Sequence, residues 1–418
     1  MSEPATPVRA PMLSVRAALD FLLAAVRPVS DIELVPTIEA NGRVLVEAQA
    51  STISVPSADN TQMDGYAVRA ADCVSGDATL TVSGRIPAGQ VGQFLAPGCA
   101  ARIFTGAMIP EGADAVVMQE QCRVNPTGTV TVLHTPKVGE WIRRAGEDIV
   151  NGAVILGAGT RLRSQELGLA ASVGLASLPV WRRLRVAVFF TGDELTMPGE
   201  APGGVLAPGA IYNSNRFLLR ALLENLGCVI TDFGIVPDTL AATRETLRQA
   251  AAGNDLIITS GGVSVGEEDH IRPAVEAEGR INMWQIAVKP GKPLAFGEVR
   301  KPDGAAFFLG LPGNPVSSLI TFMLFVRPFI LRQQGVNEVG PARSYQMRAN
   351  FNWSKPDRRN EFLRVKINDA GGLDLFPNQG SGVLTSTVWG DGLVDVAPGQ
   401  LIASGDMVRF IPFTEMLH

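Results

Sequence analysis

A glycine-rich turn, residues 259–269 (TSGGVSVGEED), lies between an apolar run and a stretch with helical periodicity. Glycines allow backbone N–H groups to approach a phosphate closely, and the amino end of the following helix adds positive potential. The pattern therefore predicts a cradle for a phosphate-bearing ligand, and a purely structural tight turn is the alternative. The residues assigned to this cradle are Gly261, Gly262, Ser264 and Gly266.

The same turn contains the pattern G-x-S-x-G at residues 262–266, which is typical of the nucleophile elbow of α/β-hydrolases. That fold needs an acid and then a histidine downstream of the serine. His270 follows Ser264 by only six residues, and His418 is the last residue of the sequence. A serine hydrolase is therefore disfavoured, and we interpret Ser264 as a ligand-binding residue.

Carboxylates follow the predicted strand ends. Asp193 and Glu194 come after the apolar run 185–190, Asp238 lies just past another apolar strand, and Asp269 ends the glycine turn. Carboxylates beside a glycine at a strand end can hold a hard cation such as Mg²⁺. Helix capping also explains Asp238 and Asp269, and a solvated turn explains the other two. Asp193 and Glu194 are therefore the candidate metal ligands that the residues themselves indicate.

Two further segments at predicted strand ends favour anion binding. Lys289 and Lys292 lie in the proline-flanked segment 289–293 (KPGKP), and two lysines held together repel unless an anion joins them. The segment 311–317 (LPGNPVS) enters the last predicted helix with Pro315 at its first position. The amides of that helix end form a second anion site.

Three other polar turns lie far from these motifs in the sequence: 63–67 (MDGYA), 104–107 (FTGA) and 143–148 (RRAGED). Each is also a plausible structural turn. If they contribute to the same site, they must reach it across a cleft or from a second subunit.

Composition limits the class of protein. The sequence has 418 residues, which predicts two to four domains, and 46% of them are hydrophobic. The formal net charge of −5 argues against a general nucleic-acid binder. The four cysteines form no C-x-x-C pair, so metal ligation by them is not expected. We see no signal-peptide pattern, and the most apolar stretch, 319–326, is too short to span a bilayer, so we expect a cytoplasmic protein.

Periodicity predicts the elements that position these motifs. We expect a first helix capped by Ser14 and ended by Pro28, a compact β region, and a helix over 164–172 that could pack against the first helix. Alternating strands and helices over 183–331 predict a parallel sheet covered on both faces. Ligands bind such sheets at the carboxyl ends of the strands.

Within that α/β region, Asn215 is the expected cap of a helix over 216–226 and Asp238 that of a helix over 239–251. The last residues return to β patterning, with hairpin signals at 368–372 and 390–392.

Seven of these segments, in this order, resemble the molybdopterin molybdenumtransferase family, the MoeA-like proteins that include the gephyrin E domain. The matching segments are 63–67 (MDGYA), 105–107 (TGA), 146–148 (GED), 191–195 (TGDEL), 260–269 (SGGVSVGEED), 289–293 (KPGKP) and 311–317 (LPGNPVS). The match covers nearly the whole chain. One departure lies after Asp269, where the family often has an aromatic residue and a lysine three residues on, whereas this sequence has His270 and Arg272.

The resemblance implies a multi-domain α/β and β fold. The domains implied are a split helical and strand domain (12–50 and 146–182), an inserted β domain (51–145), a molybdopterin-binding α/β domain (183–333) and a C-terminal β-barrel-like domain (334–418). It also implies a homodimer in which the β domain of one subunit faces the α/β domain of the other. The implied reaction takes adenylylated molybdopterin and molybdate to molybdenum cofactor and AMP, with Mg²⁺.

Residue roles follow from the same resemblance. Molybdate would be held by Lys289, Lys292, Ser317 and the amides after Pro312, with Pro315, Arg364 and Ser381 completing that pocket. Asp64, Thr105, Arg143 and Asp148 would act from the opposing subunit. The residues that the resemblance implies as catalytic are Asp64, Thr105, Asp148, Glu194, Asp238 and Asp269. Those that would place Mg²⁺ or orient ligand groups are Asp193, Glu194, Asp238 and Asp269.

Two related functions remain as alternatives: the preceding adenylyl transfer to molybdopterin, and a non-catalytic scaffold of the same fold. The extra domains and the KPGKP segment argue against the first, and the intact acidic set and lysine pair argue against the second. The adenylyltransferase of the same pathway is an expected partner, and neither nucleic acid nor membrane is.

Overall fold

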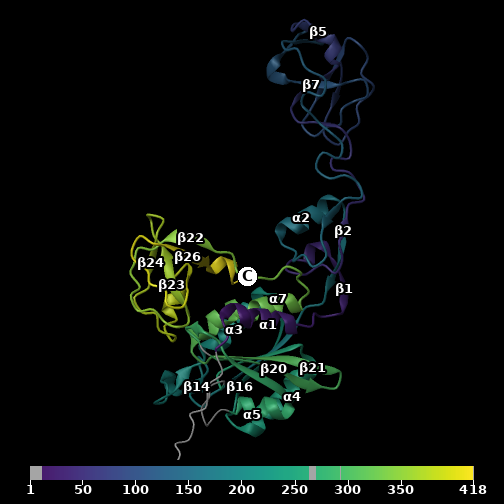
Figure 1. Cartoon of the computed structure of the whole chain (residues 1–418). Coiled ribbons are helices and arrows are strands. Elements are labelled where there is room, and N and C mark those ends of the chain that lie inside the picture. Colours follow the sequence, from purple (N-terminus) through teal and green to yellow (C-terminus); the bar gives the residue numbers. More distant parts are fainter. Residues whose placement is uncertain (1–11, 263–269, 292, 418) are drawn as a thin grey trace, which may run out of the picture.

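The computed structural model describes residues 12–262, 270–291 and 293–417. Figure 1 shows an elongated chain with a β unit at one end and the α/β unit at the other, and a C-terminal β unit lies beside the latter. The chain passes through a smaller helical and strand unit between the two ends.

A mixed six-stranded sheet forms the centre of the α/β unit, in the order β16-β13-β17-β21-β20-β18. Its strands are β13 (Arg185–Thr191), β16 (Val229–Val236), β17 (Leu256–Ser260), β18 (Gly279–Gln285), β20 (Pro293–Lys301) and β21 (Gly304–Leu311). The four strands from β16 to β21 are parallel, whereas β20 and β18 run antiparallel to their neighbours.

The prediction of a parallel sheet was therefore wrong at one edge. Lys301 pairs with Gly304, so only Pro302 and Asp303 connect β20 to β21. A two-residue connection can join only antiparallel strands. The segment 301–304 (KPDG) has turn residues that would have predicted this hairpin.

Helices cover both faces of this sheet, as expected. They are α1 (Val15–Ala25), α3 (Ser214–Asn225), α4 (Leu240–Gly253), α5 (Ile271–Glu278), α6 (Pro315–Thr321) and α7 (Arg327–Gln333). Successive residues of β13 alternate between the two cores: Val186 and Val188 pack in the cluster that contains α1, α3, α6 and α7, and Ala187 packs in the cluster of α4 and α5. This alternation is the period-2 pattern of a strand buried on both faces.

A π-helical turn, Phe322–Val326, joins α6 and α7 into one continuous helix. The helix Pro315–Gln333 is long and apolar enough to cross a membrane by length and composition, but 78% of its apolar window is buried inside the protein. It is therefore the core helix of the α/β unit.

One of three predicted helix caps is confirmed, and the other two helices are capped by different residues. Ser14 caps α1, where its hydroxyl accepts a hydrogen bond from the Ala17 amide at 3.1 Å. Asn213 rather than Asn215 caps α3, and Thr239 rather than Asp238 caps α4. Both displaced side chains make contacts at the strand ends instead, as described below.

The middle unit is formed by two segments that are far apart in the sequence. Strand β1 (Ile32–Pro36) pairs with β12 (Ser177–Trp181), and β2 (Gln49–Ala50) pairs with β11 (Val154–Leu156). Helix α2 (Ser164–Ser172) has the predicted bounds and packs against β11. The expected packing of this helix on α1 was wrong, because the apolar face of α1 lies against α7 in the core of the α/β unit.

The β unit at the far end contains a six-stranded sheet in the order β7-β4-β6-β5-β9-β8. Its strands are β4 (Gly65–Val68), β5 (Ala78–Ile86), β6 (Cys99–Ile103), β7 (Ala115–Met118), β8 (Cys122–Val124) and β9 (Thr129–Val132). Two short strands, β3 (Asn60–Thr61) and β10 (Ile142–Arg143), pair beside it.

The C-terminal unit has its own sheet in the order β19-β23-β25-β26-β22, with β24 paired to β23. Its elements are β19 (Val288–Lys289), β22 (Tyr345–Arg348), β23 (Asn360–Ile367), β24 (Leu373–Leu375), α8 (Thr385–Trp389), β25 (Gly392–Val396) and β26 (Met407–Pro412). The hairpin predicted at 368–372 is confirmed as the β23–β24 turn. The hairpin predicted at 390–392 was wrong, because that segment leads from α8 into β25.

Phe329 stabilises the core of the α/β unit, because its ring meets those of Phe307 and Phe296 at centroid distances of 5.1 and 5.8 Å. We expect Phe329→Ala to lower the free energy of unfolding by about 3–5 kcal/mol. Urea denaturation followed by circular dichroism measures this change. Phe94→Ala is the matched control, because Phe94 is 63% exposed and its truncation should change stability by less than about 0.5 kcal/mol.

Candidate functional site

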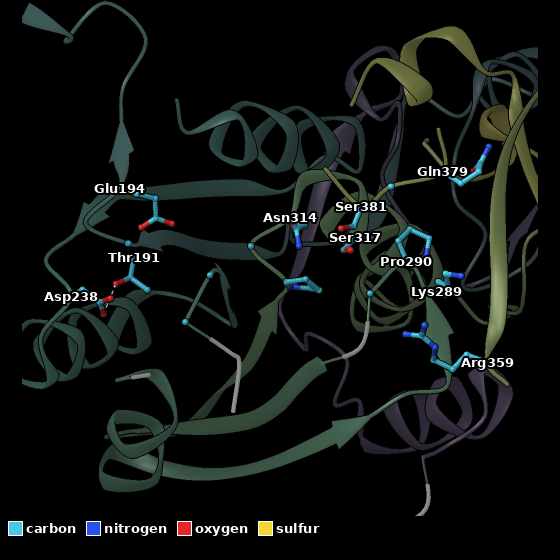
Figure 2. A pocket seen from close by; sticks show the side chains of 17 residues that line it. Thr191, Glu194, Asp238, Lys289, Pro290, Asn314, Ser317, Arg359, Gln379 and Ser381 are labelled. Carbon is cyan, nitrogen blue, oxygen red and sulfur yellow. Dashed lines mark hydrogen bonds between the residues drawn. The ribbon is translucent and has the colours of Figure 1, made fainter. Parts of the chain in front are cut away.

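A cavity of about 650 Å³ lies where the carboxyl ends of β13, β17 and β21 meet the C-terminal unit. Figure 2 shows its side chains facing one another from these two units. The lining residues are Thr191, Gly192, Glu194, Asp238, Gly261, Gly262, Lys289, Pro290, Gly291, Pro312, Gly313, Asn314, Ser317, Arg359, Gln379, Gly380 and Ser381.

Parallel register brings the first two loops of this cavity into contact. Phe190 pairs with Ser260, and Ser260 pairs with Leu311, so the three strands end together. Gly261 follows with φ +98°, and a Cβ there would lie 2.7 Å from the Thr191 carbonyl oxygen. Only glycine fits this close approach of two loop backbones.

One end of the cavity is acidic. Glu194 and Asp238 both line it, and the Thr191 hydroxyl donates a hydrogen bond to Asp238 Oδ1 at 3.0 Å (Figure 2). This contact explains why Asp238 does not cap α4. Asp193 is not among the residues that line the cavity, so of the two adjacent carboxylates only Glu194 is placed in its lining.

The described residues bring no three His, Cys, Asp or Glu side chains together in a group that could hold a metal. The two carboxylates at the acidic end nevertheless fit one mode of Mg²⁺ binding. Mg²⁺ is commonly held by one or two carboxylates together with substrate phosphates and water. Glu194 and Asp238 could therefore hold a Mg²⁺ ion that a phosphate-bearing substrate shares.

The opposite end is cationic. Lys289 and Arg359 line it from neighbouring segments, because β19 pairs in parallel with the start of β23 and aligns Lys289 with Glu361. Lys289 Nζ lies 2.7 Å from Glu361 Oε1 and 3.4 Å from Asp357 Oδ2. Arg359 forms a forked ion pair with Asp357, which holds the pKa of that carboxyl well below its ordinary value.

The amino end of α6 forms the floor between these two ends. Pro315 occupies the first helical position after Asn314, as predicted, but it does not line the cavity. Ser317, two residues further on, does line it and is 2% exposed. Ser381 closes the floor from the C-terminal unit, where its carbonyl oxygen accepts a hydrogen bond from the Val316 amide at 3.0 Å.

Asn215, interpreted from the sequence as a helix cap, holds two of the loops together. Its Nδ2 donates to Ser260 Oγ at 2.8 Å and to the Gly313 carbonyl at 2.7 Å. Ser260 Oγ in turn donates to the Pro312 carbonyl at 3.0 Å. The signal that could have found this role is an amide side chain on the buried face of α3.

Arg364 lies behind the cavity rather than in it. It is completely buried and donates to Ser386 Oγ, to the Phe362 carbonyl and to the Gly380 carbonyl at 3.1, 3.3 and 3.1 Å. Burial lowers its pKa to about 10. Arg364 therefore supports the loop that carries Ser381, whereas Arg359, which we did not predict, is the arginine that lines the cavity.

The residues expected to act from another subunit lie in or beside the distant β unit (Figure 1). Asp64 and Thr105 are brought together, because the Thr105 amide and hydroxyl donate to Asp64 Oδ1 at 2.8 and 2.7 Å. The hydrogen bond from the Thr105 backbone N–H is the main reason that the pKa of Asp64 is lowered. Arg143 and Asp148 are exposed, and none of the four lines the cavity of the same chain.

Four predicted site residues fall outside the described parts of the chain: Ser264, Gly266, Asp269 and Lys292. Gly261 and Gly262, at the start of the same glycine turn, line the cavity.

An α/β sheet whose strand ends carry glycine turns, a helix amino end and opposed acidic and cationic side chains defines an enzyme-like site for an anionic ligand. The chain also matches three known family regions. They are the MoeA N-terminal region (domain I and II) at 13–174, the probable molybdopterin binding domain at 187–332 and the MoeA C-terminal region (domain IV) at 346–413.

Relatives of known name match over most of the chain. It is 41% identical to the molybdopterin molybdenumtransferase of Haemophilus influenzae over 91% of this chain and 93% of that protein. It is 38% identical to that of a Nostoc species, over 88% and 86% of the two chains. A crystal structure of the molybdopterin biosynthesis moeA protein from Pyrococcus horikoshii superposes with a TM-score of 0.81 at 27% identity, covering 96% of this chain and 100% of the other.

The chain therefore belongs to the molybdopterin molybdenumtransferase family, and the resemblance inferred from its seven segments is confirmed.

Replacing Arg359 or Arg364 with methionine distinguishes a residue that binds the ligand from one that supports the loop carrying Ser381. Arg359→Met removes a charged donor from the cavity, so we expect about tenfold weaker binding of a tetrahedral oxyanion and little change in stability. Arg364→Met strands several buried hydrogen-bond partners and should lower the free energy of unfolding by about 2–4 kcal/mol. Calorimetric titration with molybdate and urea denaturation measure the two effects. Equal effects of both variants on binding, with stability unchanged, would contradict this assignment.

Proposed function

We propose that this chain inserts molybdate into adenylylated molybdopterin, releasing AMP and forming molybdenum cofactor. The observation that carries the proposal is a single cavity with a cationic end suited to an oxyanion and an acidic end suited to a metal-bound phosphate. The names of the relatives that match most of the chain support the same activity.

At the cationic end, molybdate would be held as a tetrahedral dianion. Lys289, Arg359 and the Ser317 hydroxyl line the cavity and can supply donors to it, and Lys292 follows Lys289 in the same segment. Charge-assisted hydrogen bonds of this kind are stronger than neutral ones. These donors orient the oxyanion toward the middle of the cavity, where the dithiolene of the pterin would lie.

At the other end, the glycine turn would hold the phosphates of the adenylylated substrate. The backbone at Gly261 and Gly262 lines the cavity, and the loop after Leu311 faces it from the neighbouring strand. Glu194 and Asp238 would hold Mg²⁺ there. When bound, Mg²⁺ neutralises the phosphoanhydride and so aids the departure of AMP.

The distant β unit would act on the cavity of a second copy of the chain. Asp64 and Thr105 form a hydrogen-bonded pair on an exposed surface, and they cannot reach the cavity of their own chain in this arrangement. A homodimer that places this pair against the partner's α/β unit would complete the site. We further propose that the protein works in the cytoplasm and receives its substrate from the adenylyltransferase of the same pathway.

An AMP-release assay tests the reaction. Purified protein given adenylylated molybdopterin, Mg²⁺ and molybdate should release AMP, because insertion of the metal and loss of the nucleotide are linked. Omitting molybdate or Mg²⁺ should reduce the release at least about tenfold. AMP release that is independent of molybdate would refute the proposed insertion activity.

Complementation between two inactive variants tests the composite site. Asp64→Asn changes the Asp64–Thr105 pair of the distant β unit, and Lys289→Ala changes the cavity. Each variant homodimer should therefore be inactive. A hybrid dimer of the two chains has one intact site of its two, so we expect the purified hybrid to have about half of wild-type activity. Co-expression with two different affinity tags and an AMP assay of the purified hybrid measure this. A hybrid without activity would show that both residues act within one chain.

A further inference from the structure

Glu361 is a buried carboxylate beside the cationic end of the cavity. The sequence analysis did not predict a role for it, and the proposed mechanism gives it none. Its side chain is 3% exposed, and both of its oxygens have a partner. Oε1 lies 2.7 Å from Lys289 Nζ, and Oε2 accepts a hydrogen bond from Trp353 Nε1 at 2.9 Å. The backbone pairing of β19 with β23 fixes Lys289 opposite Glu361. Glu361 is therefore held in place on three sides.

A second acid, Asp357, likewise pairs with the cations of the cavity without lining the cavity itself. Its carboxylate accepts from Arg359 Nε at 3.0 Å and from Nη2 at 2.9 Å, and it lies 3.4 Å from Lys289 Nζ. Lys289 and Arg359 both line the cavity, whereas neither acid does. The acids thus pair with the cations from outside the lining of this cavity, and Glu361 instead lines a smaller hollow beside it together with Lys289.

This arrangement fixes the directions of the free donors. A lysine ammonium has three N–H donors, and the ion pairs that Lys289 makes with Glu361 and Asp357 restrict the directions in which these donors can point. Arg359 uses Nε and Nη2 for Asp357, and among the described residues its Nη1 makes no hydrogen bond, so it can face a ligand. The two acids convert mobile cations into directed hydrogen-bond donors.

The same arrangement sets the local charge. Lys289 and Arg359 contribute two positive charges and Asp357 and Glu361 two negative charges, so these four described side chains sum to zero. An uncompensated pair of cations would hold a dianion strongly and release it slowly, because each additional charge at this range changes the interaction by a kcal/mol or more, on the order of tenfold in affinity. Cations whose charge is partly offset by carboxylates bind an oxyanion more through the direction of their hydrogen bonds and less through excess charge.

We propose that Glu361 and Asp357 are positioning residues that hold Lys289 and Arg359 toward the oxyanion and offset part of the positive charge at this end of the cavity, so that molybdate is oriented and can still leave toward the pterin. This inference rests on the proposed function, because it concerns the transfer of the bound oxyanion.

Replacing Glu361 with glutamine tests both parts of this role. Glu361→Gln keeps the shape of the side chain and removes one negative charge. Molybdate should then bind on the order of tenfold more tightly, while AMP release at saturating molybdate should fall about tenfold because Lys289 is no longer directed. Equilibrium dialysis with molybdate and the AMP assay measure the two quantities. A merely structural role would weaken binding and activity together.

Two more variants separate charge from orientation. Asp357→Asn makes the same change of charge at a less buried position, so it should also tighten molybdate binding and gives the answer if Glu361→Gln does not fold. Trp353→Phe removes one hydrogen bond to Glu361 without changing charge, so molybdate affinity should stay unchanged and the transfer rate should fall. Glu278→Gln is the matched control, because Glu278 is ion-paired to Arg244 and Arg248 away from the cavity and should change neither quantity.

Unchanged molybdate affinity in both Glu361→Gln and Asp357→Asn would overturn the inference, as would tighter binding with an undiminished rate. Wild-type protein that neither binds molybdate nor releases AMP would instead refute the proposed function itself, and so the two failures are distinguishable.

Discussion

The parallel register of β13, β17 and β21 is the constraint on which the rest of the site depends. These strands end at the same edge, so the loops after Thr191, Ser260 and Leu311 must share one space. That space is tight enough to require glycine at Gly261, and the buried amide of Asn215 joins two of the loops. A rigid sheet edge of this kind can present backbone amides and short side chains to a ligand without further ordering.

The C-terminal unit completes the cavity through backbone pairing rather than through loose contact. Strand β19 belongs in sequence to the α/β region, yet it joins the C-terminal sheet beside β23. The Val316 amide at the start of α6 also donates to the Ser381 carbonyl. Two separate hydrogen-bonded links thus connect the units across the cavity, and the cationic end is shared between them.

The elongated arrangement of the chain explains why the sequence motifs divide into two groups. The motifs of the α/β and C-terminal units meet in one cavity, whereas Asp64 and Thr105 meet each other at the opposite end (Figure 1). Asp64 and Thr105 are held by hydrogen bonds as well defined as those in the cavity. A second copy of the chain would give this pair a ligand to act on, which is why we propose a composite site.

The sequence by itself determined the local chemistry: the glycine that a positive φ requires, Pro315 at the start of its helix, and the lysine at the end of an apolar strand. These features depend on neighbours within a few residues. It did not determine that Arg359 lines the cavity and Arg364 supports it. Arg359 immediately precedes β23 whereas Arg364 lies within it, and the register of β23 with β19 and β25 decides where each side chain lies. The antiparallel edge at β20, the bridging role of Asn215 and the buried partner of Lys289 likewise depend on contacts between distant segments, which only the tertiary structure specifies.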